Sequence, residues 1–490
     1  MLSDDKDVGS ALFNAPLVVD LDGTLTPSDT LVESAVLLVR QRPWLLFALL
    51  WWLLQGRAGF KDKVAEACRL PVVHLPWRAD LLDWIHSQRT LGRKVVLATA
   101  AHRQIADDVS RALPLFDAVL SSDRDNNLKG TAKLAAIQRE IGPRFTYAGD
   151  SAADLPIWAA AQSAVLVGAT PSVVRQVRAS PVHIEREFQL QESGGWSRLR
   201  TWLKAIRIHQ WVKNALLFVP LLTSFSFTDP TRLGAAFLAF CAFCVAASGT
   251  YLLNDVWDLE NDRQHPRKKE RPLASGRLPL HYGVVAAFAL LLAGLGLAAI
   301  VSWQFAVMLA GYICLTTTYS WVLKAYVLAD VIALALLYAY RVLAGAVAIN
   351  VVLSPWLLAF SVFTFLSLAL VKRCSELVSL SQAGKPATRG RDYRVTDLVV
   401  LWPLGVGAGL CAVLVFCLFI GSPEARGTYG ESPALWLVGV GLTYWLARMW
   451  IKTARGEMHD DPIVFALKDR GSLVVIAAMG ALPVAAHFVR

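Results

Sequence analysis

Aspartates occur in this chain at spacings that suit phosphate and metal chemistry. The segment Pro16 to Thr24 reads PLVVDLDGT, an apolar run that ends in Asp20 and Asp22 beside a glycine. One carboxylate can attack a phosphoryl group while a second carboxyl protonates the leaving oxygen. Because ligands bind where strands end in α/β folds, we expect both aspartates at a cleft.

Three further segments of the first 195 residues supply groups that this chemistry needs. A strand-like run from Lys94 to Ala98 ends in Thr99, NLKGTAKLAAI covers residues 127–137, and TYAGDSAAD covers residues 146–154. Together with DLDGT, these elements resemble the haloacid dehalogenase (HAD) superfamily, in particular its phosphoserine-phosphatase-like members. The resemblance extends over about residues 14–180.

This resemblance implies a role for each polar residue of the four segments. Asp20 is expected as the nucleophile and Asp22 as the acid. Thr99 and Lys133 are expected to contact the phosphoryl oxygens. A Mg²⁺ ion would neutralise the phosphate, and its expected ligands are Asp20, Asp22, Asp150 and Asp154. The alternative is a domain that keeps the fold without catalysis.

A second acidic motif lies farther along the chain, where Asn254 to Asp262 reads NDVWDLEND. On a helix Asp255, Asp258 and Asp262 stand at i, i+3 and i+7, so their carboxylates share one face. Three like charges repel one another unless a cation intervenes, and Mg²⁺ holding a diphosphate would supply it. We therefore expect a second Mg²⁺ bound by these three aspartates, with Asp255 and Asp258 also catalytic.

The residues around this motif carry a second resemblance. RQHPRKKERPLASG follows from Arg263 to Gly276 as a dense basic loop. The pattern NDxxDxxxD followed by RPLASG resembles the UbiA superfamily of membrane prenyltransferases over about residues 203–490, which implies a bundle of nine helices. Members with aromatic acceptors carry a second motif of DxxxD type. Here the corresponding segment, Tyr319 to Asp330, has a single Asp.

Other motifs are closer to the decaprenyl-phosphate phosphoribosyltransferase branch of that superfamily. They are QWVKN at residues 210–214, the single Asp330 after YSWVLK, and KRCSE at residues 372–376. In that branch the oxygen of a polyprenyl phosphate attacks the anomeric carbon of phosphoribosyl pyrophosphate, and diphosphate departs. These two substrates are the partners that the resemblance implies.

The same resemblance points to a set of substrate-binding residues. They are Lys213, Asn214, Asn254, Arg271, Lys324, Asp330, Lys372 and Arg373, with Tyr393 and Asp469 as further candidates. The lysines have an alternative interpretation as markers of the cytoplasmic side. Because two phosphate-handling domains share one chain, we hypothesise that the first removes the 5-phosphate from the lipid product of the second.

The composition indicates what must position these residues. Of 490 residues, 55% are hydrophobic and 18% are charged, which is typical of membrane burial. Apolar runs of spanning length begin only after Trp211. We count nine of them, near 211–227, 232–253, 281–301, 304–323, 326–348, 352–371, 398–420, 434–451 and 471–489.

The predicted organisation is an α/β domain with a helical cap followed by an all-α membrane bundle. The domains are residues 1–195, a linker helix at 196–210 and the bundle at 211–490. The linker mixes Trp, Leu and Ile with Arg and Lys, so it is either an interfacial helix on lipid headgroups or an ordinary amphipathic linker. The cap insertion includes PWLLFALLWWLL at residues 43–54, too short to span, which either touches membrane or packs within the cap.

Charge and the start of the chain indicate location. Residues 1–15 have acidic residues and no apolar core, so no cleavable signal peptide is expected. The basic residues gather in loops on the same side as the amino-terminal domain, which predicts a multi-pass protein of the cytoplasmic (inner) membrane with that domain in the cytoplasm. The net charge of +10 follows from these loops, so no nucleic-acid partner is expected. The sequence leaves the oligomeric state open.

Two other functions are compatible with parts of the pattern. A prenyl diphosphate donor with an aromatic or other small acceptor would keep the enzyme class, although the single Asp330 disfavours it. A transporter with a regulatory phosphatase domain would place ionisable groups near the bilayer midplane, whereas the charges here gather at one face.

Overall fold

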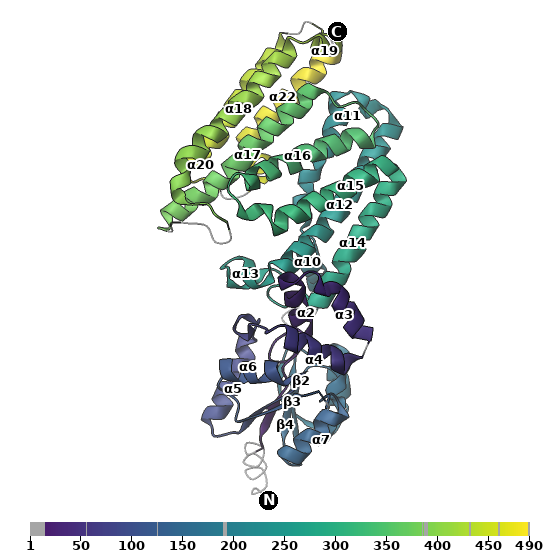
Figure 1. Ribbon diagram of the computed structural model, residues 1–490, viewed down its shortest axis with the longest axis vertical. Helices are drawn as coiled ribbons and strands as arrows, with labels where there is room; N and C mark the ends of the chain where they lie inside the picture. Colours follow the sequence, from purple (N-terminus) through teal and green to yellow (C-terminus); the bar gives the residue numbers. More distant parts are fainter. Residues whose placement is uncertain are drawn as a thin grey trace, which may run out of the picture. The chain divides into compact units, whose positions relative to one another are not determined.

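The computed structural model describes residues 15–54, 56–124, 126–189, 194–384, 386, 391–430, 433–458 and 461–488. The chain forms two compact units, shown with their elements in Figure 1. The first unit comprises residues 1–206 with 251–286, and the second comprises residues 207–250 with 287–490.

A parallel sheet of six strands forms the centre of the first unit. The strand order is β3-β2-β1-β4-β5-β6, and every neighbouring pair is parallel. The strands are β1 Leu17–Val19, β2 Val95–His102, β3 Ala118–Ser122, β4 Thr146–Gly149, β5 Ser163–Val167 and β6 His183–Phe188. The order reverses between β1 and β4, and in open α/β sheets ligands bind at such a switch point. The three predicted strands are present, but β2 continues beyond Thr99.

Helices cover both faces of this sheet. Successive residues of β1 alternate between two cores, with Leu17 and Val19 on one face and Val18 on the other. The first face packs against α5 Ala79–Thr90 and α6 Arg103–Ala112. The second packs against α7 Thr131–Glu140, α8 Leu155–Ala160 and α9 Pro171–Arg178. The expected α/β domain is thus confirmed as a three-layer arrangement.

The cap segment between β1 and α5 is helical, as the sequence predicts. It contains α2 Thr30–Gln41, α3 Leu45–Leu54, α4 Arg57–Ala67 and η1 Val72–His74. Asp29 starts α2 by accepting hydrogen bonds from the backbone N–H groups of Leu31 and Val32.

Two later segments complete the first unit. The linker helix is α10 Gly195–Ala205, shorter than predicted, because Arg207 has a positive φ of 53°. Residues 251–286 contribute two short elements, α13 Leu259–Gln264 and η5 Lys268–Glu270. Within this unit the Arg263 guanidinium contacts the Glu33 carboxylate of α2 at 2.5 Å.

Helices make up the described part of the second unit, and two of them, α12 and α14, run on into the first. Their bounds are η3 Ile208–Phe218, α11 Val219–Thr223, η4 Ser226–Thr228, α12 Pro230–Trp257, α14 Leu280–Val301, α15 Trp303–Trp321, η6 Leu323–Ala325, α16 Ala329–Ala348, α17 Pro355–Gln382, η7 Val395–Asp397, α18 Leu398–Ile420, α19 Pro423–Tyr429, α20 Ala434–Ala454, α21 Pro462–Lys468 and α22 Arg470–Phe488.

Within the described ranges, seven helices are long and apolar enough to cross a membrane. Each coincides with one of the nine predicted runs. The first predicted run, 211–227, is instead divided between η3 and the five-residue α11, so it is no continuous helix. The fourth predicted run forms α15, which is not among the seven, and its last turns carry Thr316 to Thr318 and Ser320. A multi-pass membrane bundle is confirmed, and nine spans remain a prediction.

Candidate functional site

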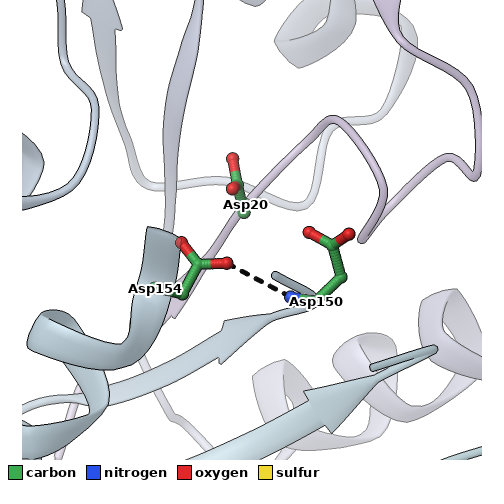
Figure 2. A group of neighbouring side chains, drawn as sticks. All are labelled: Asp20, Asp150 and Asp154. Carbon is green, nitrogen blue, oxygen red and sulfur yellow. Dashed lines mark hydrogen bonds between the residues drawn. The ribbon is translucent and has the colours of Figure 1, made fainter. Parts of the chain in front are cut away.

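Three carboxylates meet at the switch point of the sheet. Asp20 follows β1, Asp150 follows β4, and Asp154 ends the short helix η2, Ala152–Asp154. One oxygen from each lies within 4.8 Å of the others, and Figure 2 shows the three side chains together. Among the residues that the structure describes, this is the one group of three or more His, Cys, Asp or Glu side chains that could hold a metal ion.

Lys133 and Tyr147 complete this buried cluster. The Lys133 ammonium, from the first turn of α7, lies 2.7 Å from Asp20 Oδ2 and donates to the Tyr147 hydroxyl at 3.1 Å. Tyr147 in turn donates to Asp154 Oδ1 at 2.9 Å. Three carboxylates against one ammonium leave an excess of negative charge, which is costly in a buried place.

The pKa values reflect this crowding. Burial, together with the charges of Asp154 and Asp20, raises the pKa of Asp150 to about 7. Burial likewise raises the pKa of Asp20, although Lys133 opposes the shift. Hard oxygen donors that repel one another are the set that Mg²⁺ binds, so the residues present fit that ion.

Asp22 and Thr99 lie beside the cluster without joining it. The Asp22 carboxylate accepts a hydrogen bond from the Thr30 N–H at 2.9 Å. The sequence predicted Asp22 as a metal ligand, but it is not among the three carboxylates that lie close enough together to hold an ion. Burial, assisted by Asp29, raises the pKa of Asp22 to about 7, so this group can hold a proton near neutral pH. Thr99 is fully buried in β2, and its Oγ1 accepts from the Ala101 N–H at 3.0 Å.

The backbone conformation and surroundings of residue 23 explain why a glycine follows the two aspartates. Its φ of +81° lies in the left-handed region, and a Cβ at this position would collide with the Asp150 carboxylate. The turn therefore brings backbone against the acidic cluster in a way that no other residue type allows.

The second acidic motif differs from its prediction. Helix α12 ends at Trp257, and Asp258 is the half-buried N-cap residue between α12 and α13, so the motif is not one continuous helix. Asp255 and Asp262 nevertheless share a face, because both contact Arg271 Nη1, at 3.0 and 2.5 Å. The three aspartates do not form a metal-sized group. The Arg271 guanidinium bridges two of these aspartates and offsets part of their repulsion, and the predicted Mg²⁺ at this motif stays a prediction.

Two predicted substrate-binding residues of this motif are thereby located. Asn254 lies in the last turn of α12, next to the bridged Asp255. Arg271 is engaged by the acidic motif itself. Burial raises the pKa of Asp262, although Arg271 opposes this.

A cluster of cations lies in the second unit. Lys213 Nζ and Lys372 Nζ both contact Asp461 Oδ2, at 2.7 and 3.1 Å, and the Tyr338 hydroxyl donates to the same oxygen at 3.3 Å. Burial would raise the pKa of Asp461, but Lys372 and Lys213 outweigh it and hold that pKa well below its ordinary value.

Arg341 extends this cluster. It is 5% exposed, its Nε donates to Asn214 Oδ1 at 3.0 Å, and it stacks over the rings of Tyr312 and Tyr338 at 4.9 and 5.3 Å. Within the described ranges three cations then lie around one carboxylate, and this excess of positive charge is suited to an anion such as a phosphate.

Other predicted residues of the second unit form a balanced group. Arg373 Nη2 lies 2.5 Å from Asp330 Oδ2, both side chains are fully buried, and Arg373 also pairs with Glu376. The Tyr319 hydroxyl donates to Asp330 Oδ1 at 2.8 Å. The Arg373 charge is thus already neutralised, so the prediction that it binds phosphate directly is not supported by its contacts.

The remaining candidates have varied surroundings. Lys324 is half-buried in η6. Tyr393 is fully buried, and its hydroxyl accepts from the Leu328 N–H at 3.0 Å. Asp469 pairs with Arg448 at 3.1 Å and accepts from the Ser472 N–H, which is a structural role at the start of α22.

Sequence reasoning missed two residues of the cation cluster. Asp461 stands in the short run Asp461-Pro462 after α20, and the nearby Asp469 was considered instead. Arg341 lies within the apolar run of α16, Ala329–Ala348, where an arginine is costly and marks function by default. That signal was present in the sequence.

Comparison with known proteins assigns the class of the chain. Residues 216–468 match the UbiA prenyltransferase family, and since the match covers more than half of the chain, the protein belongs to this family. The expected membrane transferase is therefore supported, and the family match does not support the transporter alternative.

Three relatives illustrate this similarity. Over 462 residues the chain is 38% identical to the uncharacterized protein y4nM of Sinorhizobium fredii, covering 93% of this chain and 88% of that protein. It is 36% identical over 285 residues to the nodulation protein NoeC of Azorhizobium caulinodans, covering 57% and 91%. It is 28% identical over 319 residues to the decaprenyl-phosphate phosphoribosyltransferase of Mycolicibacterium smegmatis, covering 62% and 98%.

Proposed function

We propose that the membrane bundle transfers a phosphoribosyl group from phosphoribosyl pyrophosphate to polyprenyl phosphate. The observation that carries this proposal is the similarity to a decaprenyl-phosphate phosphoribosyltransferase along 98% of that protein. The single Asp330 at the place of a second acidic motif is consistent with it. In this reaction the lipid phosphate oxygen bonds to the anomeric carbon as the bond from that carbon to diphosphate breaks.

The proposed roles follow from charge. Lys213 and Lys372 share the Asp461 carboxylate, and the Arg341 guanidinium stacks on the Tyr338 ring beside them, so the positive charge of this cluster would stabilise phosphate oxygens. Asp255, Asp258 and Asp262 offer the oxygen donors that would hold Mg²⁺, which would neutralise the departing diphosphate. Arg271 bridges two of these aspartates, so Mg²⁺ would compete with it for their oxygens, and a bound phosphate would compete with the aspartates for its guanidinium.

The test is an assay with purified protein, Mg²⁺, polyprenyl phosphate and phosphoribosyl pyrophosphate labelled in the ribose. Label should appear in the lipid fraction, and Asp255→Ala should abolish it. An Asp469→Asn variant, changed at a structural ion pair, serves as the matched control and should retain transfer. If the lipid stays unlabelled while a prenyl diphosphate and an aromatic acceptor react, the alternative donor is correct.

We further propose that the amino-terminal domain is a HAD-type phosphatase. The arrangement that supports it is the acidic cluster with Lys133 at 2.7 Å from Asp20. Mg²⁺ held by Asp20, Asp150 and Asp154 would neutralise charge on the phosphate. Asp20 would form a bond to phosphorus as the ester bond breaks, and Asp22 would give its proton to the leaving oxygen. Water would then release inorganic phosphate from the aspartyl phosphate, with Asp22 accepting its proton.

The two activities would act in sequence. The bundle would make polyprenyl-phosphoribose 5-phosphate, and the phosphatase domain would remove the 5-phosphate on the cytoplasmic side of the inner membrane. Asp20→Asn should leave transfer intact and cause the phosphorylated lipid to accumulate, whereas the wild type should convert it. An unchanged product pattern would refute the coupling, because Asp20 is the only proposed nucleophile.

A further inference from the structure

Helix α3 is apolar on two opposite faces, although only one of them is packed. Leu45, Leu49 and Trp52 stand at i, i+4 and i+7 and contribute to the core that α3 shares with α2 and α4. Figure 1 shows these three helices next to one another. The inner face is thus sufficient to hold α3 in the cap.

The outer face of the same helix is exposed. Phe47, Trp51 and Leu54, again at i, i+4 and i+7, are 77%, 63% and 80% exposed, and Trp44, Leu46 and Leu53 are exposed beside them. A helix that is hydrophobic all round belongs in a core or in lipid. None of the described residues covers this face, so an apolar environment beyond them would stabilise it.

The charges around α3 favour a lipid surface as this partner. From Ser34 to Lys61 the sequence has no Asp or Glu but four basic residues. Arg40 pairs with Glu260 and Lys61 donates to Ala100 O and Asn127 Oδ1, so the basic residues that flank the exposed face are Arg42 before α3 and Arg57 after it. An apolar face with a basic rim is the pattern of helices that lie in an anionic bilayer interface. Tryptophans such as Trp44 and Trp51 are enriched at that depth.

A second helix of the same unit repeats the pattern. On α10 the exposed residues Trp196, Leu199 and Leu203 stand at i, i+3 and i+7, and the helix carries Arg198, Arg200 and Lys204 with no acidic residue. The chain continues from α10 within a few residues into a family of membrane enzymes, so a bilayer is always near this unit.

We propose that α3 is a membrane-contacting helix, and that the amino-terminal unit rests on the bilayer through α3 as well as through its connection to the bundle. The surface stands independently of the phosphatase proposal. Helix α3 packs next to α2 in the cap, and the Thr30 N–H of α2 binds Asp22. If the phosphatase proposal also holds, membrane contact through α3 would bring the phosphatase site to phosphate groups carried by lipids.

Photocrosslinking of the full-length protein tests this surface without depending on any activity. A benzophenone amino acid replaces Phe47 or Trp51, and the protein is placed in proteoliposomes of phosphatidylethanolamine and phosphatidylglycerol. Leu292, exposed on the spanning helix α14, is the positive control, and Gln138, exposed on α7, is the negative control. Because each buried apolar side chain shifts partition into lipid by about tenfold or more, lipid adducts at Phe47 should exceed those at Gln138 at least about tenfold.

Two outcomes would overturn the proposal. Adducts that join two copies of the chain would show that a second copy covers α3. Yields at Phe47 and Trp51 no higher than at Gln138, with Leu292 labelled normally, would show that α3 does not contact lipid. A Leu49 substitution, on the buried face, should give adducts within the chain only, which verifies that the helix remains folded.

Discussion

Among the residues that the structure describes, Asp461 is the one carboxylate of the cation cluster, and replacing it by Asn removes this charge while keeping the size of the side chain. Its Oδ2 lies 2.7 Å from Lys213 Nζ and 3.1 Å from Lys372 Nζ. At an effective dielectric constant of about 20, these two attractions amount to about 6 and 5 kcal/mol before desolvation is counted. Leaving a buried charge unpaired costs about 3–5 kcal/mol in other proteins. Since the Lys372 side chain is 39% exposed, we expect a loss at the lower end, about 3 kcal/mol.

Thermal unfolding in detergent measures this loss. For a unit of this size, a loss of about 3 kcal/mol corresponds to a fall of roughly 6–12 °C in Tm. Added pyrophosphate should restore stability more in Asp461→Asn than in the wild type, because the site has lost one negative charge. That difference is about 1–2 kcal/mol, or about tenfold in affinity.

The matched control is Asp469→Asn, which breaks the partly exposed pair with Arg448. Its loss should be about 1 kcal/mol or less, with no additional gain from pyrophosphate. If both variants lose the same stability, or if pyrophosphate protects Asp461→Asn no better than the wild type, the cluster is not an anion site.

Three further predictions concern the first unit. Gly23→Ala should abolish phosphatase activity, because the added Cβ would collide with the Asp150 carboxylate of the proposed metal site. Gly92→Ala is the control: Gly92 has a φ of +85° and open space around it, so this change should cost only backbone strain, about 1–3 kcal/mol of stability. Unfolding and phosphate-release assays on both variants separate the loss of stability from the loss of activity. Glu185 is paired with the buried Arg93 at 2.5 Å; burial raises its pKa, but Arg93 lowers it more, so its folded pKa lies below its unfolded value. Its contribution to stability is therefore present above the unfolded pKa and is lost as the pH falls through the folded pKa, and Glu185→Gln should remove this part of the acid dependence of unfolding. Arg271→Gln should free the two aspartates that it bridges and strengthen Mg²⁺ binding, measured as a larger Tm shift on Mg²⁺ titration, and an unchanged titration would contradict a metal site there.

The sequence allowed the sheet and most membrane helices to be predicted because their signals are local. The nine residues PLVVDLDGT indicate a strand followed by a turn, and long apolar runs indicate membrane-spanning helices. The prediction of a continuous helix failed for one of these apolar runs. Residues 211–227 are apolar enough to span, but Pro220 lacks a backbone N–H, and the run divides into η3 and α11.

The sequence predicted the candidate site of the sheet better than that of the helical bundle. Asp20, Asp150 and Lys133 could be placed together because strand order in α/β folds follows general rules. The partner of a lysine in a helical bundle follows no such rule, since any of several helices can supply it. Lys213 and Arg373 therefore looked alike in the sequence, and Asp461, which lies 248 residues from Lys213, was not found.

The distribution of countercharges separates the basic residues that could handle phosphate from those that support the fold. Arg373 and Arg391 face Asp330 and Glu376, so two positive charges meet two negative ones. A buried group balanced in this way has no electrostatic need for a further anion.

The cluster around Asp461 is different, because within the described residues Lys213 and Lys372 share one carboxylate, and the Arg341 guanidinium stacks on the Tyr338 ring beside them. Keeping such an excess of charge in a mostly buried place is costly, and natural proteins retain it where a ligand supplies the missing charge. The acidic cluster at Asp20 presents the same situation with the opposite sign, since three carboxylates meet one lysine. One site has an excess of positive charge and the other an excess of negative charge, which is the combination expected for the proposed reactions on phosphates with Mg²⁺.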